Sequence, residues 1–284
     1  MGGLIMQQVE EPKTTQTQQK EIIARNVEGV YETLVSHIEG CLSKVTIDNT
    51  KEVKKGIALL AEPYEVKKWL EGEVTRNIII FHDMGKKTDD FQERVLHNSK
   101  KHVPHAIQSA VIYLYNQMEQ LTVEDPYYHN KRWWVYLLSY IIAQHHVTIN
   151  INKLYGHESG LIKFLEKEEF KKIGYTHSGP LEDVISYWQQ ASQIREITLR
   201  EYQVLTDALD LLRTVDHAAA EDFDTEVYQQ LLTEEESLLI NDKVETYESF
   251  LQLLKEDYHM NAQIEQSSKG YKKGLMQQIL ASRK

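Results

Sequence analysis

A histidine and an aspartate stand side by side at the end of an apolar segment of the sequence. His82 and Asp83 directly follow Ile78–Phe81, and Lys86 comes three residues after the aspartate. An imidazole nitrogen is a ligand of divalent transition metals, and a carboxylate can bridge two such ions. The lysine adds a cation that can hold a phosphate group. This short stretch therefore predicts metal-assisted chemistry on a phosphate ester.

A second adjacent pair, His145 and His146, ends another apolar segment. His37, His105 and Asp216 fall on positions that face inward if their segments are helices. Each residue alone has an ordinary explanation, because a histidine on an apolar face is often a hydrogen-bonded core residue. Two pairs together with three inward-facing residues favour a metal site over that explanation.

Asp216 has its own alternative reading. An ionised carboxylate on an apolar helical face is costly unless it is paired, hydrogen-bonded or bound to a metal. A buried ion pair with Arg213 or another base would account for it equally well when Asp216 is considered alone.

Helices are the elements that must position these groups. Apolar residues recur at intervals of three and four, which is the spacing of one helical face. The run of isoleucines in Ile78–Phe81 also fits a short buried strand, and Gly85 can terminate the preceding helix. The predicted helices cover residues 22–38, 64–81, 88–96, 104–114, 133–145 and 205–219, with further helices at about 181–194, 224–232, 243–258 and 270–282.

The composition predicts an all-α protein. The 284 residues include only 5 Pro and 13 Gly, so little interrupts the helical segments. Residues 1–19 are polar and lack a periodic apolar face, and we expect a flexible N-terminal leader there. Residues 20–284 are expected to form one helical domain with a C-terminal helical extension.

A single cysteine, Cys41, cannot form an internal disulfide, and no signal sequence or membrane span is recognisable. These features predict a cytoplasmic location. The 32 lysines and arginines against 43 acidic residues give a formal charge of −11. Such a chain is poorly suited to capture a nucleic acid on its own, although bound ions or a partner protein can overcome this repulsion.

Taken together, the ligand-type residues resemble the HD phosphohydrolase superfamily, and within it the nuclease domain of the type I CRISPR nuclease-helicase. The resemblance spans about residues 30–220 and rests on His37, the HDMGK motif that begins at His82, His105, the pair His145 and His146, and Asp216 within TVDHAAA.

This resemblance implies a helical domain with a dinuclear centre that cleaves single-stranded DNA and sometimes RNA. One ion would be held by His37, His82, Asp83 and Asp216, and the other by His105, His145 and His146, with Asp83 as the bridge and Lys86 facing the scissile phosphate. Such a pair of ions lowers the pKa of a bound water and neutralises charge on the phosphate oxygens. Imidazole-rich ligation favours manganese, nickel, cobalt or iron over magnesium.

The sequence departs from that family pattern in two ways. Val147 and Thr148 stand where a glycine pair commonly follows the twin histidines, and no GxxxxGK[ST] phosphate loop is present. The expectation is therefore a stand-alone nuclease subunit that works with a separate CRISPR helicase and a crRNA-guided effector complex.

Two other functions remain open. A phosphohydrolase acting on nucleotides or cyclic nucleotides would suit the negative charge, since a small substrate needs only a local pocket. A helical adaptor that keeps a metal for structural reasons would bind metal without hydrolysis. Trp133 and Trp134 could stack on bases of a single strand, although core packing is the commoner use of such residues. The remaining histidines lie in polar contexts and are assigned no role, with His217 the least secure exclusion.

Overall fold

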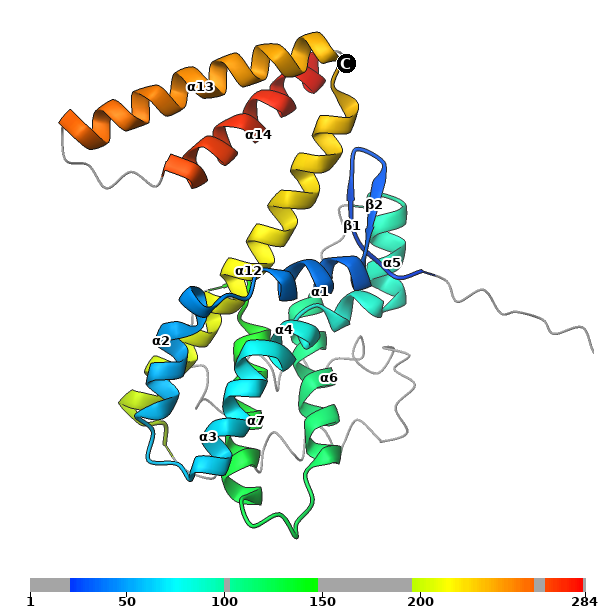
Figure 1. The fold of residues 1–284 in the computed structure, drawn as a ribbon. Helices are drawn as coiled ribbons and strands as arrows, with labels where there is room; N and C mark the ends of the chain where they lie inside the picture. The colour runs from blue at the N-terminus through cyan, green and yellow to red at the C-terminus, as the bar shows by residue number, and fades with distance from the viewer. Residues whose placement is uncertain (1–20, 100–102, 148–195, 258–263, 283–284) are drawn as a thin grey trace, which may run out of the picture.

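The computed structural model describes residues 21–99, 103–147, 196–257 and 264–282, which are mostly helical (Figure 1). The predominantly helical class predicted from the sequence is confirmed for these residues. The predicted leader and the helix predicted at 181–194 lie outside them. In chain order the elements are β1 (Ile23–Val27), β2 (Val30–Thr33), α1 (Leu34–Ser43), α2 (Ile47–Ala58), α3 (Tyr64–Gly72), the π-helical turn η1 (Glu73–Asn77), α4 (Ile78–Phe81), the 3-10 turn η2 (Met84–Lys87), α5 (Asp89–Leu96), α6 (His105–Gln120), α7 (Tyr128–Ala143), α12 (Leu199–Leu231), α13 (Glu234–Asp257) and α14 (Ile264–Ser282).

The first element is a β-hairpin, not the start of a helix. Its antiparallel strands pair Val27 with Val30 across a two-residue turn in which Glu28 and Gly29 have φ of 49° and 89°. Left-handed backbone at both positions is typical of a tight hairpin turn, and glycine adopts it without strain. The prediction of a helix from residue 22 was wrong, and α1 begins at Leu34.

The segment 64–81 is helical throughout, which excludes the strand reading of its isoleucines. The π-helical turn lies between α3 and α4, and Glu73 within this turn is 3% exposed. Its carboxylate accepts hydrogen bonds from the Tyr113 hydroxyl at 2.7 Å and from the Asn77 amide at 2.8 Å. Ile78 and Ile79 are fully buried, so α4 is anchored in the core immediately before His82.

Helices α6 and α7 form the centre of the main core. Helix α6 begins at His105, one residue after Pro104, which was predicted to be the first helical residue. Trp133 and Trp134 are 1% and 0% exposed, and their indole nitrogens donate to carboxylates of Glu201 and Glu62. Both tryptophans are therefore core residues, which confirms the commoner reading and excludes them as a base-stacking surface.

One long helix, α12, replaces the two shorter segments predicted at 205–219 and 224–232. Its first half packs on α2, α7 and α1, and a Cβ added at Gly40 of α1 would lie only 3.3 Å from the Cβ of Ala219. Small residues at this contact let α1 and α12 approach closely. The approach brings Asp216 toward His37.

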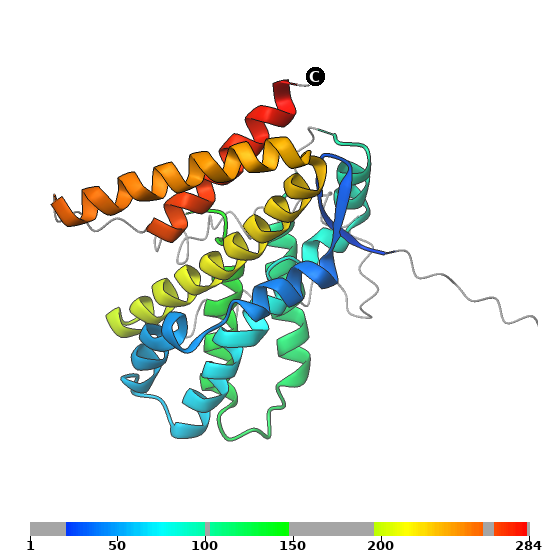
Figure 2. The ribbon, with the colours of Figure 1, turned by 45° about the horizontal axis from the view of Figure 1, so that its top comes forward.

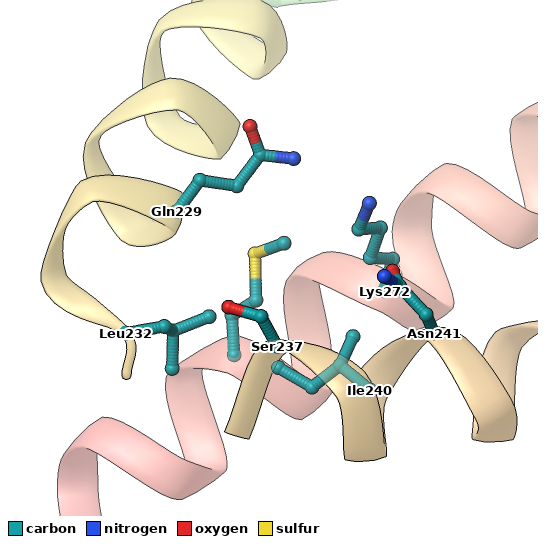
Figure 3. A pocket seen from close by; sticks show the side chains of 7 residues that line it. Gln229, Leu232, Ser237, Ile240, Asn241 and Lys272 are labelled. Carbon is teal, nitrogen blue, oxygen red and sulfur yellow. The ribbon is translucent and has the colours of Figure 1, made fainter. Parts of the chain in front are cut away.

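The second half of α12 extends beyond the main core to the helix pair α13 and α14 (Figures 1 and 2). A separate apolar cluster joins the three helices to the hairpin and consists of Val27, Val227, Tyr228, Ile240 and Met276. A small pocket opens between the three helices (Figure 3) and is lined by Gln229, Leu232, Ser237, Ile240, Asn241, Lys272 and Met276. Among the described residues, no helix combines the length and the apolarity needed to cross a membrane.

Candidate metal centre

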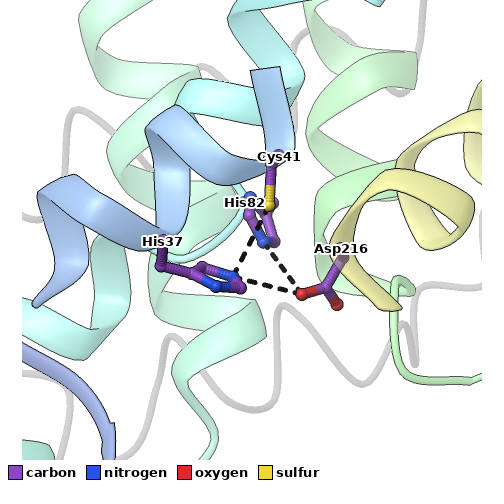
Figure 4. Close-up of side chains that lie close together, drawn as sticks. All are labelled: His37, Cys41, His82 and Asp216. Carbon is purple, nitrogen blue, oxygen red and sulfur yellow. Dashed lines mark hydrogen bonds and ion pairs between the residues drawn. The ribbon is translucent and has the colours of Figure 1, made fainter. Parts of the chain in front are cut away.

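Four ligand-type side chains meet where α1, the end of α4 and α12 come together (Figure 4). They are His37 and Cys41 from α1, His82, and Asp216 from α12, and their ligand atoms all lie within 4.8 Å of one another. Oδ1 of Asp216 is 3.2 Å from Nε2 of His37 and 3.6 Å from Nε2 of His82. We call these four residues the first ligand group.

A second ligand group consists of Asp83, His105, His145 and His146, again with all ligand atoms within 4.8 Å. Oδ1 of Asp83 is 3.2 Å from Nε2 of His105 and 3.8 Å from Nε2 of His145. Nε2 of His146 lies 2.9 Å from Nε2 of His105. The beginning of α6 and the end of α7 therefore direct three imidazoles at one carboxylate.

Asp83 joins the two groups. While Oδ1 faces the second group, Oδ2 lies 3.2 Å from Nε2 of His37 and 3.4 Å from Nε2 of His82. A carboxylate whose two oxygens face different sets of ligands has the arrangement required of a bridge between two ions. Six of the seven residues predicted as metal ligands thus surround the seventh, Asp83, which is 1% exposed.

The histidines are oriented by hydrogen bonds on their far side. Nδ1 of His82 donates to the carbonyl of Ile79, and Nδ1 of His145 donates to the carbonyl of Ile142, both at 2.7 Å. Because a carbonyl only accepts, the proton sits on Nδ1 and the lone pair of Nε2 faces the centre. Both Nε2 atoms are buried and make no hydrogen bond to the described part of the chain. Two buried acceptors without a proton donor fit a bound cation.

For His37 the outer partner is a carboxylate. Nδ1 of His37 lies 3.4 Å from Oε1 of Glu32, which is 4% exposed and sits on the second strand of the hairpin. A carboxylate behind an imidazole is a common way to orient a metal-binding histidine and to increase its basicity. Glu32 therefore belongs to the candidate centre as an orienting residue.

The charges of the centre favour a cation between the two groups. Burial by itself raises the pKa of Asp83, but the Lys86 ammonium beside it holds the pKa of this carboxyl well below its ordinary range. Burial likewise opposes ionisation of Asp216, yet the hydrogen bond from His37 lowers its pKa. Two buried carboxylates that stay ionised require positive charge beside them. Lys86 supplies one such charge, and either a proton on His37 or a metal ion can supply more.

The twin histidines have the opposite electrostatics. Burial is the largest cause that lowers the pKa of His145 to about 3, and burial together with His105 lowers the pKa of His146 to about 4. Both imidazoles are therefore neutral at pH 7. Neutral imidazole is the form that binds metal.

Gly85 explains how the turn after His82 reaches the second ligand group. A Cβ at this position would lie 2.2 Å from the carbonyl oxygen of His105, so only glycine allows the turn to press against the start of α6. The amide of Gly85 donates to Oγ of Ser109 at 2.8 Å, and this hydroxyl donates to the same His105 carbonyl. The prediction that Gly85 ends the preceding helix was wrong, since α4 ends at Phe81.

Lys86 and Arg213 have clear positions at the edge of the centre. Nζ of Lys86 pairs with Oδ2 of Asp83 at 2.6 Å, and the lysine side chain is 12% exposed. Its predicted contact with a scissile phosphate stays a prediction.

Arg213 does not pair with Asp216. Nε of Arg213 donates to the carbonyl of His145 at 2.9 Å, and a terminal nitrogen of the same guanidinium donates to the carbonyl of Gln144. His217 is exposed to solvent, in line with its exclusion.

Two members of the centre were missed from the sequence. Cys41 stands four residues after His37, a spacing that puts both side chains on one helical face, so a signal was available. Glu32 was missed because the segment that contains it was predicted to be a helix and is a β-hairpin in the structure.

Comparison with known proteins gave no relatives. No family model, no curated protein and no solved structure matches this chain. The two ligand groups are able to hold metal.

Proposed function

We propose that the protein is a metal-dependent HD-type phosphodiesterase that cleaves single-stranded DNA, as the stand-alone nuclease of a type I CRISPR system. The observation that supports it best is the position of Asp83, whose two carboxylate oxygens face different ligand groups. Phosphodiester hydrolysis is the chemistry for which two closely spaced ions are most often used. The order of the ligand residues along the chain supports the HD type.

In this proposal the first ion would be held by His37, His82, Asp83 and Asp216, and the second by Asp83 and the three histidines of the second group. When bound, the ions would supply the Lewis acidity that activates water and neutralises charge on the phosphate. The chain itself fixes the ligands, keeps His145 neutral and holds the tautomers of His82 and His145 through carbonyls of α4 and α7.

The role of Lys86 is to orient the phosphate. Its ammonium group is 2.6 Å from Asp83 and retains some exposure to solvent, so it can exchange this ion pair for a phosphate oxygen. The net charge of −11 makes independent capture of DNA weak. A helicase and a crRNA-guided effector complex would deliver the strand.

The test is cleavage of a labelled single-stranded DNA oligonucleotide by the metal-depleted protein after addition of Mn²⁺, Ni²⁺, Co²⁺ or Mg²⁺. We expect metal-dependent shortening, which Asp216→Ala should abolish because one ligand and one negative charge are lost. His217→Ala is the matched control, since it alters the neighbouring exposed residue of the same helix and should leave cleavage unchanged. Equal activity in both variants would contradict the assignment of Asp216.

A second candidate is a phosphohydrolase acting on nucleotides or cyclic nucleotides. The acidic surface favours it, because a small substrate does not need an extended basic track. A parallel panel of free nucleotides separates the two functions. Hydrolysis of nucleotides beside an intact oligonucleotide would select the second, and metal binding without any hydrolysis would favour an adaptor.

A further inference from the structure

The thiol of Cys41 points into the first ligand group. Cys41 lies one helical turn after His37 and is 0% exposed, and its Sγ is 3.7 Å from Nε2 of His37 (Figure 4). Sγ is also within 4.8 Å of the ligand atoms of His82 and Asp216. Three different elements therefore present two nitrogens, one oxygen and one sulfur to a common point.

The spacing of these atoms suits a small coordination shell. With metal–ligand bonds of roughly 2.0 to 2.3 Å, the edges of a tetrahedron are about 3.3 to 3.8 Å long. The separations observed around His37 Nε2 are 3.2 Å to the Asp216 oxygen and 3.7 Å to the Cys41 sulfur, and His82 Nε2 is 3.6 Å from the same oxygen. Sulfur gives the longest separation, as the longer metal–sulfur bond requires.

A buried cysteine often serves only as a small apolar side chain, and Cys41 does contact the main core. Two observations favour a ligand instead. Its sulfur faces polar atoms of three ligand-type residues, and Nε2 of His82 beside it is buried without a hydrogen-bond partner in the described part of the chain. An apolar role explains neither.

We propose that Cys41 is a further, thiolate ligand of the ion held by His37, His82, Asp83 and Asp216, and that this half of the centre selects a borderline-soft ion such as Zn²⁺, Co²⁺ or Fe²⁺. The proposal rests on the proposed function in that it concerns the same metal centre. Thiolate ligation favours these ions over Mg²⁺, whereas the second ligand group contains only imidazole and carboxylate. The two halves would therefore differ in metal preference.

Cobalt spectroscopy tests this assignment directly. The metal-depleted full-length protein is titrated with Co²⁺, and a thiolate-to-cobalt charge-transfer band is sought in the near ultraviolet beside the weaker visible bands of bound cobalt. Cys41 is the single cysteine of the chain, so any such band can come from this residue alone. We expect the band in the wild-type protein and its loss in Cys41→Ser and Cys41→Ala, with the visible bands retained.

Matched measurements keep the result interpretable. His146→Ala removes a ligand of the second group and should leave the charge-transfer band intact. The Zn²⁺ affinity of the first group should fall by at least about tenfold in Cys41→Ser, since even outer partners of metal ligands contribute about 10- to 100-fold. The wild-type spectrum does not depend on the folding of any variant. Visible cobalt bands without a charge-transfer band, or no bound cobalt at all, would overturn the proposal.

The DNA-cleavage assay is independent of this readout. A charge-transfer band in a protein that cleaves no DNA keeps Cys41 as a ligand and rejects the nuclease function. Metal-dependent cleavage without the band keeps the nuclease function and rejects Cys41 as a ligand.

Discussion

Gly85→Ala should damage the metal centre without touching any metal-ligand side chain. A Cβ at this position would lie 2.2 Å from the carbonyl oxygen of His105 and 2.8 Å from Cβ of Gln108. Carbon and oxygen atoms at rest are separated by about 3.3 Å or more, so the turn and α6 must move apart by about 1 Å. That movement separates Asp83 from His105, whose ligand atoms are now 3.2 Å apart.

The size of the effect follows from this displacement. Overpacking of a buried contact costs about 1 to 3 kcal/mol, and the close neighbour here is backbone, which cannot rotate away as a side chain can. Metal–ligand distances tolerate about 0.2 Å, so a shift of about 1 Å exceeds what the second ligand group can accommodate. A misplacement of this size near a reaction centre can lower the rate about 100-fold.

Three measurements separate these consequences: thermal unfolding of the metal-depleted protein, titration with Mn²⁺ or Co²⁺, and DNA cleavage. Gly72→Ala is the matched control, because a Cβ at Gly72 would meet no atom within 4 Å and its backbone is already helical. We expect the control to keep wild-type metal affinity and to gain slightly in stability. Wild-type stability and metal affinity in Gly85→Ala would refute the role of this close contact.

Three further perturbations probe other parts of the centre. Glu32→Gln should weaken metal binding about 10- to 100-fold by removing the charge behind His37. Glu39→Gln, at an exposed position of α1, is the control and should leave metal affinity unchanged. Isothermal titration with Zn²⁺ compares the two variants, and equal affinities would exclude an orienting role of Glu32. Ala219→Leu should destabilise the fold by about 1 to 3 kcal/mol in denaturant unfolding, because it forces α1 and α12 apart, and an unchanged midpoint would show that the helices do not depend on this contact. His145, with its pKa lowered to about 3, stays neutral in the folded state while the unfolded chain takes up a proton below its ordinary value of 6.5. The contribution of neutral His145 to the free energy of unfolding is therefore fully present above pH 6.5 and is lost as pH falls toward 3, by up to about 1.4 kcal/mol per pH unit. In His145→Asn the free energy of unfolding should decline less steeply between pH 6 and pH 4. A slope identical to that of the wild-type protein would contradict the lowered pKa.

The residues of the centre could be predicted from the sequence because their helices have regular apolar faces. Asp216 illustrates this well, since Leu212, four residues before it on α12, and Ala219, three residues after it, are apolar and buried, so the carboxylate had to point inward. What an inward-pointing group meets is a different matter. The contacts of Asp216 with His37 and His82 depend on the crossing of α1 with α12, which the sequence does not encode locally.

The hairpin was mispredicted because one spacing fits two structures. Val27, Val30 and Leu34 fall at intervals of three and four, as on a helix, but Val27 and Val30 also belong to two short strands on either side of Glu28 and Gly29. Two consecutive residues with positive φ cannot continue a helix, so the turn at Glu28 and Gly29 favours the hairpin over the helix. The close approach at Gly85 was equally hidden, since it depends on a backbone atom of another element.

The acidic charge of the chain and the proposed function are compatible for a local electrostatic reason. The two carboxylates of the centre, Asp83 and Asp216, are buried, whereas most of the other acidic residues in the described part of the chain lie at the surface and are screened by salt. Two divalent ions would carry more positive charge than these two carboxylates neutralise, and Lys86 adds to it, so a phosphate would meet a local positive field. This field acts over short distances only. Delivery of a strand to the centre by a partner, and not attraction from a distance, is therefore the route that the charge distribution favours.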